Sequence, residues 1–133
     1  MDNKYHIVKI IGYNDLIDEE VIIQIKDFTI ECLRQDVLKD PPIGSIWNTE
    51  LSAVFFDKVN IEEFKGQKEK GLIKNDGLSY TLYGIYDADT QCIDIGFKVD
   101  LTDGGLYDYG YLDGKFVEVT VTRFDIVLLN QIK

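Results

Sequence analysis

Apolar and polar residues alternate with a period of two through most of this chain, a pattern typical of β-strands with one buried face. The clearest case is the segment 21–33, where the alternation changes phase at Lys26-Asp27. A two-residue turn at that dipeptide predicts a β-hairpin with one coherent apolar face. The cross-strand pairs on this face would be Ile25 with Phe28, Ile23 with Ile30 and Val21 with Cys32. One long strand kinked by a bulge is the alternative.

The same alternation predicts further strands over residues 5–12, 45–56, 80–86, 93–101 and 115–128. In the last of these, Arg123 breaks the phase, which indicates a bulge or a corner. We therefore predict a mainly β fold, an antiparallel barrel or rolled sheet of about eight strands, with a β-sandwich as the alternative. In outline this resembles small barrels such as the OB-fold, a likeness of architecture that implies no activity.

One segment carries helix signals. Asn60 and Glu63 have the spacing of a capping box, with Asn in place of Ser or Thr, and Gly71 is placed to end a helix. We predict a short helix over residues 61–70 on this basis. Gly66 lies inside it and lowers helix propensity by about 1 kcal/mol relative to Ala.

The chain has 133 residues, which predicts a single β-rich domain, 1–133. Residues 1–57 and 76–133 show a weak similarity at an offset of 70 residues, for example between 43–47 and 113–117. The two halves would form an internal pseudo-repeat joined by a helical linker, 58–75. The alternative is that any two alternating β segments resemble each other.

Acidic residues outnumber basic ones by 24 to 14, which gives a net charge of -10. Residues 75–114 hold eight Asp and one base, Lys98, whereas 58–74 is rich in Lys. Such an acidic surface opposes nucleic acid and anionic membranes and would steer a basic protein partner toward it. No apolar run approaches the roughly 18 residues of a membrane-spanning helix, and no signal segment is evident, so a cytoplasmic location is predicted.

The residue types that commonly carry catalysis or bind metal are few. His6 is the only histidine, and no serine lies in a Gly-x-Ser-x-Gly motif. Cys32 and Cys92 are predicted to be reduced thiols, with a disulfide as the alternative if the chain is exported. The Asp-rich turns lack the ligand spacing of an EF-hand loop. The sequence therefore predicts no metal or cofactor and favours a protein that is not an enzyme.

The segment 104–114 is the most distinctive, because three Tyr alternate with Asp and Gly. Tyrosine gives a large amphipathic contact area at a small entropic cost, as in many binding loops. We predict a partner-binding site in which the tyrosines are the buried anchors and the aspartates give charge complementarity. Its members are Tyr107, Asp108, Tyr109, Tyr111 and Asp113. The alternative is that these tyrosines cover the core.

These features favour an acidic binding module, immunity-like or inhibitor-like, that engages a basic protein partner. Bacterial nuclease immunity proteins are similar in their balance of acidic residues and Tyr, without a shared motif. A second hypothesis is a small-molecule-binding or enzymatic barrel with a Tyr/Asp-lined pocket. That pocket would comprise Tyr80, Tyr83, Tyr86, Asp87 and Asp89. A third is an OB-like nucleic-acid binder using the Lys-rich stretch 58–74.

Overall fold

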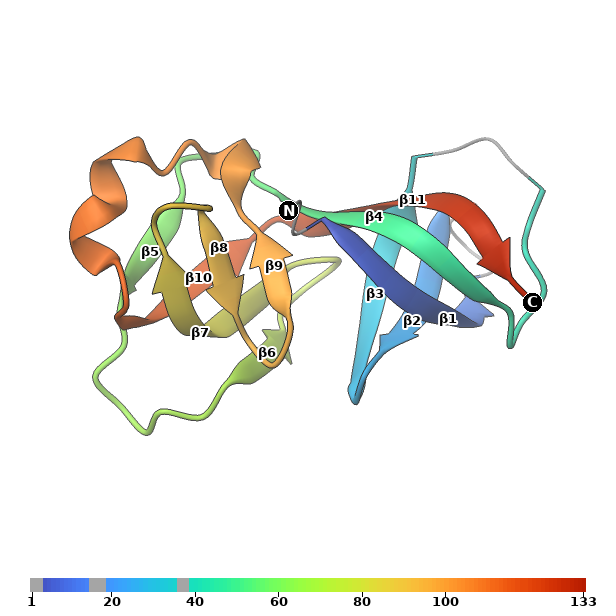
Figure 1. Cartoon of the computed structure of the whole chain (residues 1–133), viewed down its shortest axis with the longest axis horizontal. Coiled ribbons are helices and arrows are strands. Elements are labelled where there is room, and N and C mark those ends of the chain that lie inside the picture. The colour runs from blue at the N-terminus through green and yellow to red at the C-terminus, as the bar shows by residue number, and fades with distance from the viewer. Residues whose placement is uncertain (1–3, 15–18, 36–38) are drawn as a thin grey trace.

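The computed structural model describes residues 4–14, 19–35 and 39–133, and its strands form two sheets that lie side by side (Figure 1). The first sheet is a closed barrel of β1 (Tyr5–Tyr13), β2 (Glu20–Ile25), β3 (Phe28–Arg34), β4 (Ile46–Val54) and β11 (Arg123–Ile132). The second has the order β5 (Asn60–Glu63), β10 (Phe116–Val121), β7 (Tyr80–Asp87), β8 (Cys92–Asp94) and β9 (Lys98–Asp100). An additional strand, β6 (Gly71–Lys74), pairs with β7. Two short 3-10 helices, η1 (Thr102–Gly104) and η2 (Tyr107–Leu112), follow β9.

The barrel closes in the order β1-β2-β3-β11-β4, and β1 pairs with β4. The pairings within the barrel are antiparallel except that of β3 with β11, which is parallel, with Leu33 opposite Asp125 and Arg34 opposite Ile126. A five-stranded barrel with this strand order has the topology of the OB-fold. The mainly β class and the small-barrel outline are therefore confirmed. The expected single barrel of about eight strands is corrected to five strands, because the other strands form the second sheet.

The second sheet is inserted between two neighbouring strands of the barrel. β4 and β11 are antiparallel partners from Val54 and Arg123 onward, and the Thr122 amide donates to the Val54 carbonyl at 2.9 Å. The chain therefore leaves the barrel after β4 and returns at the same place, where the sequence predicted a corner at Arg123 (Figure 1). The proposed halves 1–57 and 76–133 do not coincide with the two sheets, because β11 belongs to the barrel.

The hairpin of β2 and β3 has the predicted register. Ile25 lies opposite Phe28 and Ile23 opposite Ile30, with a turn at Lys26 and Asp27. Lys26 has a φ of 51°, the left-handed conformation that such a tight turn requires. The alternative of one long kinked strand is thereby excluded.

The predicted helix over residues 61–70 is wrong, and so is the helical linker 58–75. Strand β5 occupies part of this segment and pairs with β10, and β6 pairs with β7. Ile61 lies opposite Val119 and is 5% exposed, so this position gains core burial that a surface helix would not give. Tertiary pairing therefore overrides the local capping signals.

The buried side chains of both sheets form one hydrophobic cluster. Phe97, from the turn between β8 and β9, makes edge-to-face contacts with Phe28 and His6 of the barrel, each with ring centroids 5.4 Å apart. Aromatic pairs in this geometry add about 0.5–1.5 kcal/mol each beyond the area that they bury. These contacts hold the inserted sheet against the barrel.

Candidate binding surface

The Tyr- and Asp-rich segment forms η2 at the end of the second sheet that is remote from the barrel (Figure 1). Leu106 and Leu112, at its two ends, are 2% and 3% exposed and belong to the core. Backbone bonds close its turns, from the Tyr109 amide to the Leu106 carbonyl and from the Asp113 amide to the Gly110 carbonyl, each 3.1 Å long. The segment is therefore held at both ends and presents a defined outer surface.

The three tyrosines of this segment differ in exposure. Tyr107 and Tyr111 are 85% and 69% exposed, and Asp108 between them is exposed as well. Tyr109 is half-buried and packs against the core, with its ring centroid 6.1 Å from that of Tyr111. Two of the three phenols thus face outward next to a carboxylate, whereas Tyr109 covers core.

Most aspartates of the acidic stretch 75–114 shape turns. Five of the eight accept a hydrogen bond from a backbone amide, at distances of 2.8 to 3.0 Å. They are Asp87, Asp94, Asp100, Asp103 and Asp113. Asp113, one of the predicted site residues, accepts from Ala88 of the neighbouring turn. These carboxylates combine a structural role with the negative charge that they give to the surface.

One of these aspartates, Asp94, accepts hydrogen bonds from both the Gly96 amide and the Lys70 ammonium. Both donate to Asp94, at 3.0 Å each, and together they hold the pKa of that carboxyl below its ordinary value, with the amide bond as the larger cause. Its charge is balanced by Lys70, so Asp94 contributes little to the field that a partner would meet.

Two grooves next to η1 and η2 are lined by carboxylates. One, of about 320 Å³, lies beside η2 and has Asp57, Asp103, Asp108 and Tyr109 among its lining residues, together with Lys58. The other, of about 390 Å³, extends along β4 and β11. Its acidic lining residues are Glu50, Asp100, Asp103 and Asp125, and Lys4 also lines it. Because Asp103 lines both, we describe the two together as the acidic groove.

The Tyr/Asp-lined pocket of the second hypothesis is not formed, because its tyrosines lie on opposite faces of β7. Tyr80 and Tyr86 point into the core and are 2% and 1% exposed. Tyr83 lies on the opposite face of the strand, where its ring packs against Phe64 at 5.1 Å. Asp87 ends β7 and Asp89 lies in the turn that follows, where its amide donates to the Asp87 carboxylate. The structure therefore does not bring these five residues around one cavity.

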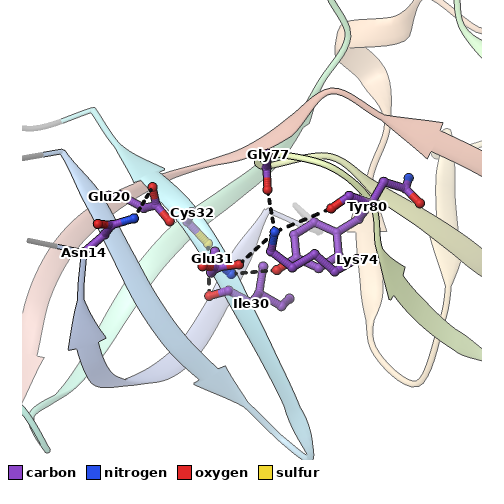
Figure 2. Close-up of polar contacts among 9 residues, drawn as sticks. Asn14, Glu20, Ile30, Glu31, Cys32, Lys74, Gly77 and Tyr80 are labelled. Atoms are coloured by element: carbon purple, nitrogen blue, oxygen red, sulfur yellow. Dashed lines mark hydrogen bonds and ion pairs between the residues drawn. The ribbon is translucent and has the colours of Figure 1, made fainter. Parts of the chain in front are cut away.

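Tyr80 instead takes part in a contact between the two sheets that the sequence did not indicate (Figure 2). Its hydroxyl accepts a 2.9 Å hydrogen bond from the Glu31 amide of β3, and Lys74 of β6 forms a 3.2 Å ion pair with the Glu31 carboxylate. Lys74 also donates to the Gly77 carbonyl at 2.6 Å. Burial raises the pKa of Tyr80, and the bond from the Glu31 amide opposes this rise. Glu31 is far in sequence from Lys74 and Tyr80, so no local sequence signal could have predicted these contacts.

A family model described as uncharacterised conserved protein UCP019853 matches residues 4–129 of the chain. The chain belongs to this family. The match runs from the residue before β1 into β11, so the UCP019853 family includes both the barrel and the inserted sheet. No curated protein and no solved structure matches the chain.

In this UCP019853 family member, the residue types that often bind metal are separated. Across residues 4–14, 19–35 and 39–133, no three His, Cys, Asp or Glu side chains are grouped so that they could hold a metal ion. Cys32 is buried in the barrel and Cys92 in the second sheet, and they do not form a disulfide with each other. Burial raises the pKa of the Cys32 thiol well above its ordinary value, which suppresses its reactivity. In the described part of the chain, no helix is sufficiently long and apolar to cross a membrane.

Proposed function

We propose that the protein is a non-enzymatic binding module that engages a basic protein partner in an immunity-like or inhibitor-like manner. The binding surface comprises Tyr107, Asp108 and Tyr111 of η2 and the acidic groove beside them. The other two predicted members support this surface: Tyr109 packs against the core and beside Tyr111, and Asp113 accepts a hydrogen bond from the Ala88 amide.

The observation that carries the proposal is the exposure of Tyr107 and Tyr111 on a segment anchored at both ends. Side chains that are 85% and 69% exposed gain nothing from the core, whereas Leu106 and Leu112 fix the backbone that presents them. A fixed backbone lowers the entropy lost on association, and tyrosine is among the residues that most often dominate binding energy.

Electrostatics support a basic partner. Tyr109 and Asp108 border the groove that also contains Asp57 and Asp103, and the sequence around them, 75–114, has eight Asp and one base. A field of this sign accelerates the encounter with a cationic protein and falls off with ionic strength. Nucleic acid is not part of the proposal, because OB-type barrels bind it on the face of strands 2 and 3. In this chain Lys74 and Tyr80 of the inserted sheet contact Glu31 of β3 there.

A cytoplasmic location is a further part of the proposal. Cys32 and Cys92 lie in different sheets as buried thiols, which a reducing compartment preserves.

The test is affinity capture from the native cell with the wild-type protein and with Tyr107→Ala/Tyr111→Ala. We expect the wild type to retain a basic protein that the double variant binds roughly 100-fold more weakly, because two exposed anchors are lost. Asp108→Asn should slow association several-fold at low salt and little at high salt. Ile73→Ala is the matched control, since Ile73 is a large hydrophobic side chain of β6 that is 58% exposed and lies outside η2 and the acidic groove.

Circular dichroism on each variant establishes that the fold is intact. Equal retention of the partner by the wild type and the folded double variant would remove η2 as the binding surface. Retention of only acidic proteins or of nucleic acid would overturn the proposed class of partner.

A further inference from the structure

Three adjacent strands of the barrel present an outer face that is rich in exposed apolar side chains. The registers of β1 with β4 and of β4 with β11 align the outward residues in three rows across these strands. The rows are Lys9, Ile46 and Ile132; then Ile7, Asn48 and Asn130; then Tyr5, Glu50 and Val127. We refer to these nine residues as the barrel face.

The barrel face concentrates apolar exposure. Of the eleven large hydrophobic side chains that are exposed among the described residues, four lie in this one set of rows. They are Tyr5 at 54%, Ile7 at 60%, Ile46 at 40% and Ile132 at 37% exposed. Single exposed hydrophobics are ordinary on a protein surface, but a contiguous group on adjacent strands is typical of an interface.

The net charge of the barrel face favours a second copy of the chain as its binding partner. Lys9 and Glu50 are its two charged residues and cancel each other, although the whole chain carries -10. The acidic stretch 75–114 lies in the second sheet (Figure 1). It meets the barrel face at the row of Glu50 and Val127, which line the acidic groove together with Asp100 and Asp103, whereas the rows of Ile7 and Ile46 do not line that groove. A second copy of the chain can therefore approach here with the least repulsion, whereas a basic partner would be drawn to the acidic groove instead.

We propose that the barrel face is the interface of a symmetric homodimer. We place the two-fold axis in the plane of the interface, across the strands and along the row of Ile7 and Asn48. This middle row then faces the same row of the second copy, and each outer row faces the other outer row of the second copy. Ile7 then meets Ile7 of the second copy, and Lys9 lies over Tyr5 and beside Glu50 of the second copy. Strands about 4.8 Å apart and rows about 7 Å apart bring the Lys9 ammonium within reach of that carboxylate.

The polar residues in the middle row also suit this arrangement. The Asn48 amide donates to the Asn130 side-chain oxygen at 3.3 Å within one copy. Each amide keeps a further donor and acceptor for its counterpart across the axis, so both can bond across the interface. Three rows cover less than a standard interface, and we expect a weak dimer with a dissociation constant of roughly 10–100 µM.

The first test is the oligomeric state of the full chain by sedimentation velocity between about 1 and 500 µM, a range that spans the expected constant. The wild type should shift from monomer to dimer over this range. Ile7→Lys should weaken the dimer at least about 30-fold, because it places two like charges against each other on the axis. Ile73→Lys is the matched control, since Ile73 is 58% exposed on a strand of the other sheet, and it should leave the dimer unchanged.

The second test reverses the charge pair. Lys9→Glu and Glu50→Lys alone should each weaken the dimer about tenfold, because the symmetric contact is made twice, and the double variant should restore it to within about threefold. A wild type that stays monomeric to 500 µM, or a double reversal that fails to restore association, would overturn the proposal. So would a monomer whose barrel face captures a different protein. Ile7→Lys alters neither η2 nor the acidic groove, and sedimentation is measured on the purified chain without a partner, so this result is independent of the partner-binding test.

Discussion

At the scale of single residues, two tyrosines on the inner face of β7 differ in the partner of their phenolic oxygen. The Tyr80 hydroxyl accepts the Glu31 amide hydrogen at 2.9 Å, whereas the buried Tyr86 hydroxyl has no hydrogen-bond partner among the described residues. Burial, with Cys92 and then Asp113 as smaller causes, raises the pKa of Tyr86 to about 12. A buried donor without a partner costs about 1–3 kcal/mol relative to its hydrated state.

The same substitution at these two positions should therefore act in opposite directions. Tyr86→Phe removes an unsatisfied hydroxyl and should raise the free energy of unfolding by up to about 1 kcal/mol. Tyr80→Phe leaves the Glu31 amide without its acceptor and should lower it by about 1–2 kcal/mol. Urea denaturation of both variants measures the two changes, and each protein is the matched control for the other. Destabilisation of equal size in both would show that Tyr86 has a partner in solution.

At the scale of elements, the segment around β5 shows where local signals fail. Its capping residues and lysines are those of a helix, but Ile61 pairs with Val119 and the chain continues past Phe64 as irregular backbone. Phe64 packs against Tyr83 at 5.1 Å and Phe116 at 6.2 Å between ring centroids. The aromatic contact on the outer face of the sheet, which sequence periodicity does not encode, fixes this conformation.

Gly66→Ala distinguishes the two conformations of this segment. In a helix the change would stabilise the protein by about 1 kcal/mol. In the structure a Cβ at Gly66 would lie 2.6 Å from Cζ of Phe64, so the ring must give up part of its packing. We expect a loss of about 1 kcal/mol in the free energy of unfolding by thermal or urea denaturation. Gly110→Ala, whose Cβ would meet no atom within 4 Å, is the control and should be nearly neutral.

Elements whose partners are close in sequence were predicted well. The hairpin of β2 and β3 has the expected register, and the phase change at Arg123 marks the corner between β10 and β11. Within segment 104–114, Tyr107 and Tyr111 are exposed, whereas Tyr109 is half-buried against the core, so three alternating tyrosines do not share one environment. Alternation tells which side chains share a face, but the side on which the core lies depends on strands elsewhere in the chain.

At the scale of the whole molecule, the main feature that the sequence concealed is the insertion. β11 carries the same alternation as any other strand, and nothing local indicates that it pairs with β4 rather than with the strands directly before it. The consequence is that the barrel closes only after residues 55–122 have been synthesised. Contacts such as Phe97 with Phe28 and Lys74 with Glu31 then hold the inserted sheet on the barrel.

This topology predicts that the barrel does not need the insertion in order to form. Val54 and Arg123 are direct partners, so joining them through Asn-Gly in place of residues 55–122 converts β4 and β11 into an ordinary hairpin. We expect the shortened chain to keep a β-type circular dichroism spectrum and a cooperative transition, at a lower midpoint because Phe28 and Glu31 lose their contacts. A matched variant with Gly-Gly-Ser-Gly at the junction tests whether the turn itself limits folding. A featureless, non-cooperative melt for both would mean that the two sheets form a single folding unit, in which the buried cluster that they share is indispensable.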